Sequence, residues 1–143
     1  MLQHRTSVGI WMSLLAMFLA SCERYKPRDV FAANVIAPIP KSVSEIIAYS
    51  YKENDRVAIL FFKSSSNDLD KIKDTKQLFP VNDPNSEMLV AVKSAIKRFE
   101  VDNKRVFMRH PEYYVSKIDS SPYVAYLVMD RGTGEAFFIK MGF

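Results

Sequence analysis

The sequence predicts an α+β fold in which amphipathic helices pack on a curled, mainly antiparallel sheet. Residues 88–99 carry apolar side chains at helical spacing. Residues 57–62 are apolar at every position, as in a strand that is buried on both faces. From residue 103 onward the apolar period changes to two, which is typical of strands joined by short turns. This order favours a helix that lies across one face of a sheet.

The first 22 residues are typical of an export signal. A short segment with Arg5 precedes an apolar run from Val8 to Leu19, which is shorter than the about 20 residues needed to cross a bilayer. The run ends in Leu19-Ala20-Ser21-Cys22, which resembles the lipobox of bacterial lipoproteins. The resemblance implies that residues 1–21 are a signal peptide removed by a dedicated peptidase, and that Cys22 becomes the lipidated anchor.

Two features bear on the fate and the location of Cys22. It is the only cysteine of the chain, and a free thiol would be a liability in an oxidising compartment, whereas a lipidated one has a use. In bacterial lipoproteins an Asp after this cysteine favours retention in the inner membrane, but the chain has Glu23 there. The resemblance therefore implies the periplasmic face of the outer membrane, with the inner membrane and the cell surface as alternatives.

The size and charge of the remaining chain bound its class. Removal of residues 1–21 leaves 122 residues, enough for one domain over residues 41–143 and a segment over residues 22–40. This part has 19 Lys and Arg against 16 Asp and Glu, a net charge of +3. So mild a charge does not indicate a nucleic-acid binder, although it weakly favours an acidic partner.

Residues 23–40 are expected to form an extended tether. Pro27, Pro38 and Pro40 favour extended backbone and argue against a continuous helix. Some 15 extended residues would reach on the order of 50 Å. The charges beside the lipid either contact anionic headgroups or are ordinary solvated linker charges; they are Arg24, Lys26 and Arg28.

Three helices are predicted before residue 103. Ser42-x-x-Glu45 fits a capping box and predicts a helix over residues 42–51. A short helix capped by Asp68 would bury Leu69, Ile72, Leu78 and Phe79. Asp83-Pro84 fits the start of a third helix, whose stripe we interpret as core rather than as the wall of a ligand pocket; its residues are Met88, Val92, Ala95, Ile96 and Phe99.

The C-terminal part is predicted to form a four-strand antiparallel meander. Its strands are expected at residues 106–108, 113–118, 123–129 and 136–141, with a glycine-rich hairpin at residues 130–134. In outline this order is similar to cystatin-like and nuclear-transport-factor-like folds. Such a similarity implies nothing about activity.

The sequence offers little for catalysis, and it predicts neither a metal nor a cofactor. His110 is the only histidine after residue 22, and the only cysteine, Cys22, is expected to be lipidated. A thiol–histidine pair is therefore excluded, and a zinc site would have to rely on carboxylates. A surface histidine is favoured over a general base, which would need a partner such as Ser116, Asp119, Ser120 or Ser121.

Two further motifs also have simpler structural interpretations. Asp68-x-Asp70 is typical of a solvated turn or helix cap rather than of an acid–base pair. Arg131-Gly132-Thr133-Gly134 precedes a strand, whereas a phosphate loop precedes a helix, so a tight hairpin is favoured.

Aromatic and basic residues of the C-terminal strands are the candidate partner-binding site. Tyr and Arg are enriched in the binding hot spots of interfaces, although aromatic residues also stabilise strand pairs. Because side chains alternate along a strand, Tyr113 and Tyr114 should point to opposite faces, as should Tyr123 and Tyr126. The candidates are Arg109, Tyr113, Tyr114, Lys117, Tyr123, Tyr126 and Arg131.

The sequence therefore favours a lipid-anchored module that binds a protein in the cell envelope without catalysis. The first hypothesis is an inhibitor or immunity-type lipoprotein that neutralises an effector or hydrolase. The alternative is an accessory subunit of an envelope-spanning secretion or conjugation machine. A third hypothesis, a hydrolase of the cell envelope, is disfavoured by the few titratable residues. Membrane contact through Cys22 is expected, and nucleic acid is not.

Overall fold

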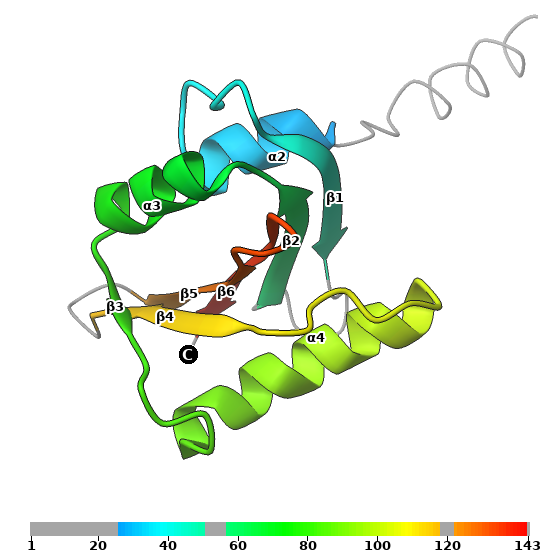
Figure 1. Cartoon of the computed structure of the whole chain (residues 1–143), viewed down its shortest axis with the longest axis vertical. Coiled ribbons are helices and arrows are strands. Elements are labelled where there is room, and N and C mark those ends of the chain that lie inside the picture. The colour runs from blue at the N-terminus through cyan, green and yellow to red at the C-terminus, as the bar shows by residue number, and fades with distance from the viewer. Residues whose placement is uncertain (1–25, 51–56, 118–121, 143) are drawn as a thin grey trace, which may run out of the picture.

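The computed structural model describes residues 26–50, 57–117 and 122–142, and it confirms the α+β class. Six antiparallel strands form one open, strongly twisted sheet in the order β1-β2-β6-β5-β4-β3 (Figure 1). The strands are β1 (Ser44–Ser50), β2 (Val57–Lys63), β3 (Leu78–Pro80), β4 (Glu112–Ser116), β5 (Tyr123–Asp130) and β6 (Glu135–Gly142).

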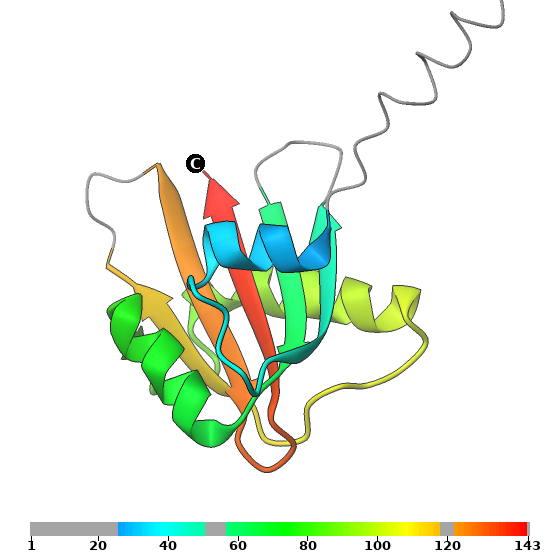
Figure 2. The ribbon, with the colours of Figure 1, turned by 90° about the horizontal axis from the view of Figure 1, so that it is seen from above.

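Helices cover both faces of this sheet. Helices α2 (Pro27–Asn34) and α3 (Ser66–Thr75) lie on one face. Helix α4 (Val90–Asp102), which follows a short 3₁₀ turn, η1 (Glu87–Leu89), lies across the other face (Figure 2). Each face has its own apolar core, so most of strands β2, β5 and β6 is buried on both sides, as predicted for residues 57–62.

Aromatic rings fill the core beneath α4. Phe61 of β2 packs against Phe107 and Phe137 at ring-centroid distances of 4.5 and 5.3 Å. Phe99 of α4 meets Phe137 edge to face at 5.3 Å. Rings in such tilted or edge-to-face arrangements stabilise a core beyond the area that they bury. Phe99 is therefore the main contact that holds the C-terminal half of α4 on the sheet.

The predicted tether is wrong over residues 27–34, which form helix α2. Pro27 occupies the first turn of this helix, where its missing N–H costs nothing. Phe31 is fully buried and meets Phe62 edge to face at 4.9 Å. Val35 and Ile36, just after the helix, are buried too. This segment is therefore part of the folded core.

The helix predicted over residues 42–51 is also wrong, because Ser44–Ser50 is strand β1. The Ser42 hydroxyl does not cap a helix of its own; it accepts the Ser65 N–H at 3.0 Å and donates to Asp68. Glu45 has a φ of 51° at a shift in the β1–β2 register, and its carboxylate pairs with Lys63 at 3.3 Å. Both halves of the apparent capping box are thus bound to distant residues. The last residue of the predicted helix, Tyr51, lies outside the described residues.

The two later helices form close to where they were expected. Helix α3 buries Leu69 and Ile72 as predicted, but Ser65 caps it, and Leu78 and Phe79 belong to strand β3. Helix α4 buries Val92 and Phe99 as predicted. It begins only at Val90, and the neighbour of Met88, Leu89, is buried in its place.

The predicted strand at residues 106–108 is absent, since this segment is an irregular connection. Phe107 in it is nevertheless buried, whereas its neighbour Val106 is 71% exposed. In place of the predicted strand, β3, which precedes α4 in the chain, pairs with β4. In this pair Phe79 lies opposite Val115. The strands at residues 112–116, 123–130 and 135–142 and the hairpin between the last two are confirmed.

Candidate functional site

The structure separates the tyrosines of the predicted site. Tyr113 packs on the α4 side of the sheet and Tyr114 on the α2–α3 side, so the prediction of opposite faces is confirmed. Tyr114 donates its hydroxyl hydrogen to Glu112 at 2.8 Å. Tyr126 is buried beneath α4, whereas Tyr123 is exposed with Lys140 4.4 Å from its ring. These four side chains therefore do not form one surface.

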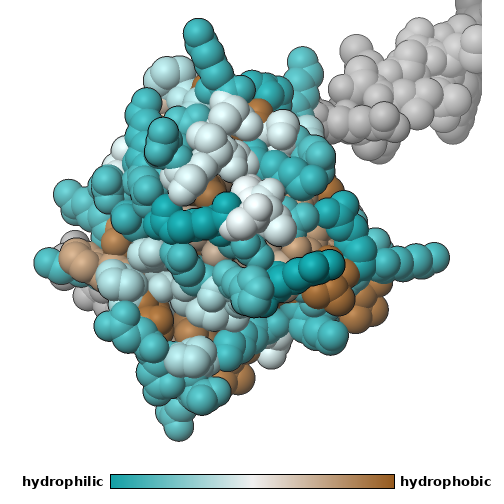
Figure 3. Space-filling view, in the orientation of Figure 1, coloured by the Kyte–Doolittle hydropathy of each residue, from teal (hydrophilic) through white to brown (hydrophobic). Residues whose placement is uncertain are grey.

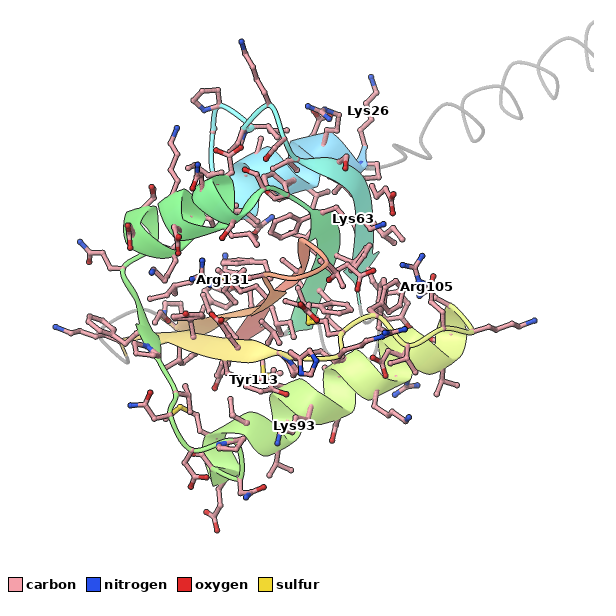
Figure 4. All side chains as sticks on the ribbon, viewed as in Figure 1. Lys26, Lys63, Lys93, Arg105, Tyr113 and Arg131 are labelled. Atoms are coloured by element: carbon pink, nitrogen blue, oxygen red, sulfur yellow. The ribbon has the colours of Figure 1, made fainter. Side chains whose placement is uncertain are left out.

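Arg131 is engaged in ion pairs within the fold (Figure 4). Its guanidinium donates to Asp70 at 2.8 Å and to Glu112 at 3.1 Å, so it links α3, β4 and the β5–β6 hairpin. Hydrogen bonds from Arg131 and then Lys73 lower the pKa of Asp70 to about 2, despite the opposing effect of desolvation. Both residues thus stabilise the fold, and the two carboxylates of the Asp68-x-Asp70 motif have different partners: Asp68 accepts the Ser42 hydroxyl hydrogen, and Asp70 belongs to this network.

The glycine-rich hairpin has a structural explanation as well. Gly134 has a φ of 73°, and a Cβ there would lie 2.6 Å from the Ser64 carbonyl oxygen. Asp130, at the base of the hairpin, is buried and accepts the N–H groups of Gly132 and Thr133 at 2.9 and 3.3 Å. The prediction of a tight hairpin is confirmed, and its backbone N–H groups donate hydrogen bonds to the Asp130 carboxylate.

The same carboxylate holds the segment that contains His110. Asp130 accepts the backbone N–H groups of Arg109 and His110, each at 3.0 Å. The His110 bond is the largest cause that lowers the pKa of Asp130. The side chains of Arg109 and His110 are exposed. Ser116 accepts the Ala125 N–H at 2.9 Å, while Asp119, Ser120 and Ser121 lie outside the described residues.

Two of the predicted residues do lie on a common surface beside α4. The Nζ of Lys93 on α4 is 5.6 Å from the ring of Tyr113 (Figure 4). The Nζ of Lys117 is 5.2 Å from the ring of Phe79. Phe79 belongs to β3 and pairs with Val115 of β4. The edge of the sheet beside α4 therefore combines aromatic rings with lysines.

This edge continues into an exposed apolar and basic surface that runs along α4, which we call the α4 face. Five of the seven exposed large apolar side chains of the described residues belong to it: Phe79 (46%), Met88 (42%), Val90 (61%), Val101 (63%) and Val106 (71%). Its exposed basic side chains include Lys93, Lys97 and Lys104. Figure 3 shows apolar side chains reaching the surface among hydrophilic ones in the lower half of the view, where α4 lies in Figure 1.

The charge of the α4 face is positive. Residues 87–106 include five basic and three acidic residues, a net charge of +2. Arg105 is partly used inside the fold, because it pairs with buried Glu135 at 3.0 Å and packs over the ring of Phe107 at 4.3 Å. The face therefore combines apolar side chains with a small excess of cations, a combination that suits a partially apolar, acidic surface.

Sequence reasoning missed most of the α4 face. The only signal was that Val90 and Val101 fall outside the buried stripe of the helix, where polar residues are expected. Phe79 was assigned to a core and Val106 to a strand. Their exposure depends on which strand pairs with β4, which local sequence does not specify.

Comparison with protein-family models, curated proteins and solved structures found no match. No helix in the part of the chain that the structure describes is long and apolar enough to cross a membrane. Within the same residues, no group of three or more His, Cys, Asp and Glu side chains is placed to hold a metal ion. The function is therefore inferred from the resemblance of residues 19–22 to a lipobox and from the α4 face.

Proposed function

We propose that this chain is a lipid-anchored protein of the cell envelope that binds another protein without catalysis, as an inhibitor or immunity-type lipoprotein does. The observation that carries the binding role is the α4 face. Single exposed apolar residues are normal on any protein, but a gathered patch with a polar rim marks an interaction site. The exposure of Val90, Val101 and Val106, each above 60%, supports this role.

The position of the anchor is compatible with this binding face. Cys22 precedes Pro27 by only five residues, which span at most about 18 Å. An acylated Cys22 would thus hold α2 close to the membrane, where the exposed side chains of Lys26 and Arg28 can approach anionic headgroups. Helix α4 covers the opposite face of the sheet, so the anchor leaves the α4 face accessible.

The charge of the α4 face specifies the kind of partner. Exposed lysines flank apolar side chains, so the matching surface carries carboxylates around an apolar centre. Complementary charges accelerate association and reject surfaces of the same sign. An exported enzyme or effector with an acidic active-site region fits this description, and blocking such a region needs only binding.

Site-specific photocrosslinking in cells tests the proposal. A photoreactive residue replaces Val101 on the α4 face in the full chain, and the matched control replaces Lys71, which is exposed on α3. We expect one defined protein to crosslink at Val101 and not at Lys71. That protein is then purified and its affinity for the natural chain is measured.

Charge reversal then shows whether the crosslinked protein uses the α4 face. Lys97→Glu should weaken binding by about tenfold, because it places a carboxylate opposite an acidic partner. Lys71→Glu makes the same charge change on the other side of the sheet and should leave affinity unchanged. If both variants bind normally, or if Lys71→Glu alone weakens binding, the α4 face is not the site.

The identity of the partner tests the inhibitor role separately. A purified hydrolase or effector should lose activity when it binds this chain. A crosslinked component of a large envelope assembly, with no activity to inhibit, would instead indicate an accessory subunit.

A further inference from the structure

A cavity of about 340 Å³ lies between α4 and the sheet, on the side of β1, β2 and β6. Its sheet wall includes Ile59 and Met141. It exists because α4 presents the small side chains of Ala91, Ser94 and Ala95 beside its buried contacts Val92 and Phe99. A cavity of this size is in the range that small-molecule sites occupy.

The two ends of the cavity differ in polarity. Arg98 and Tyr49 line it near the C-terminal end of α4, since the Tyr49 hydroxyl donates to Asp102 at 2.9 Å. Ala91 lines the opposite end, about 10 Å further along the helix axis. Strand order also separates the walls, because β2 lies between β1, which carries Tyr49, and β6, which carries Met141. The cavity is thus an apolar slot that has the Arg98 cation, the Tyr49 hydroxyl and the Asp102 carboxylate near one end.

We propose that this cavity binds a single unbranched acyl chain that ends in a carboxylate. The carboxylate lies at Arg98, and the chain extends along Ile59 and Ala95 toward Met141. A guanidinium has five N–H donors and stays charged at every physiological pH. Arg98 can therefore donate hydrogen bonds to a carboxylate in addition to its contacts within the protein. This site is distinct from the proposed protein-binding role and does not depend on it.

The volume of the cavity limits the length of the chain. It corresponds to about eleven groups the size of a water molecule, and a methylene group is of comparable size. The site should therefore favour chains on the order of ten carbons. Within that limit each added methylene should tighten binding about fourfold, as expected for transfer of a methylene from water to an apolar site.

Calorimetric titration of residues 22–143, which retain every helix and strand of the described residues, with sodium decanoate tests the proposal. Decanoate should bind, octanoate should bind about sixteenfold more weakly because it lacks two methylenes, and decanol should bind more weakly than decanoate because it lacks the charge. Arg98→Gln should weaken decanoate by about tenfold and leave decanol unchanged. Lys97→Gln, an exposed neighbour on α4, should change neither affinity.

Ala95→Phe fills the cavity and should abolish binding in a protein that still melts cooperatively. If this variant fails to fold, chemical shifts of the natural chain decide instead: decanoate should perturb Ile59, Ala95 and Met141 more than residues of α2 or α3. The proposal is overturned if decanoate does not bind at millimolar concentration, if Ala95→Phe binds it normally, or if the perturbed residues lie elsewhere.

Discussion

Asp130 is a buried residue whose carboxylate is hydrogen-bonded within the fold. Its carboxylate accepts four backbone N–H groups, from Arg109, His110, Gly132 and Thr133. It thereby joins the connection after α4 to the β5–β6 hairpin. Charge-assisted bonds of this kind are stronger than neutral ones, and an amide side chain in the same place would offer two hydrogens to donors.

Asp130→Asn should lower the free energy of unfolding by roughly 1–3 kcal/mol at pH 7. The pKa of Asp130 is lowered in the folded chain, first by the His110 N–H, so its stabilisation is complete above the unfolded pKa of about 3.9 and is lost as pH falls through the folded pKa. Denaturant melts should therefore show a difference between the two proteins at pH 7 that shrinks below about pH 4.

Asp74→Asn is the matched control for this substitution, because its side chain is mostly exposed and pairs only loosely with Lys73, at 3.8 Å. It should leave the melts nearly unchanged at both pH values. A difference between natural and Asp130→Asn protein that stays constant down to pH 2 would mean that the charge of Asp130 is not what holds the connection.

At the level of elements, α2 changes the extent of the folded unit. Phe31→Ala should cost about 3–5 kcal/mol, since it empties a fully buried site against Phe62. Ala33→Ser, on the exposed side of the same helix, should cost less than about 1 kcal/mol. Equal stability of the two variants in denaturant melts would mean that residues 27–34 act as a tether and do not belong to the folded core.

Helix α4 gives a second comparison within one element. Phe99→Ala removes a ring that contacts Phe61, Phe107 and Phe137 and should cost about 3–5 kcal/mol. Lys97→Ala should change stability by less than about 0.5 kcal/mol. If melting curves show Lys97→Ala to be the more damaging change, the buried face of α4 has been assigned wrongly.

Sequence predicted best the elements whose apolar pattern follows from how many of their faces are covered. Strand β2 is apolar from Val57 to Phe62 because a core lies on each face of the sheet, and α4 has an apolar stripe because one of its faces is covered. Ser42-x-x-Glu45 misled because its hydroxyl and carboxylate find partners at Ser65 and Lys63, over twenty and eighteen residues away. Proline at residue 27 misled because a helix tolerates it in the first turn.

At the level of the whole molecule, the candidate site was predictable only in part. Tyr113 and Lys117 were found from strand composition, and they lie on the α4 side of the sheet. Tyr114 and Arg131 belong to the opposite side, where Tyr114 donates a hydrogen bond to Glu112 and Arg131 forms ion pairs. The α4 face brings together residues from β3, η1, α4 and the connection after α4, and such an assembly is specified by long-range pairing rather than by any local pattern.

The anchor and the binding surface have complementary positions in the whole molecule. Four residues separate Cys22 from Pro27, so a lipid on Cys22 would place the start of the fold close to the membrane, and we expect partner capture near the bilayer. In that arrangement the α2 side would face the anchor and the α4 side would stay open to the envelope. This arrangement suits a protein that intercepts another protein near the membrane.

Lipid attachment at Cys22 is the claim on which this arrangement rests, and metabolic labelling with radioactive palmitate tests it most directly. The natural chain should incorporate label and sediment with membranes, and Glu23→Gln should do the same. Cys22→Ala should accumulate as a larger, unlabelled precursor. Label in Cys22→Ala, or none in the natural chain, would contradict the anchored module.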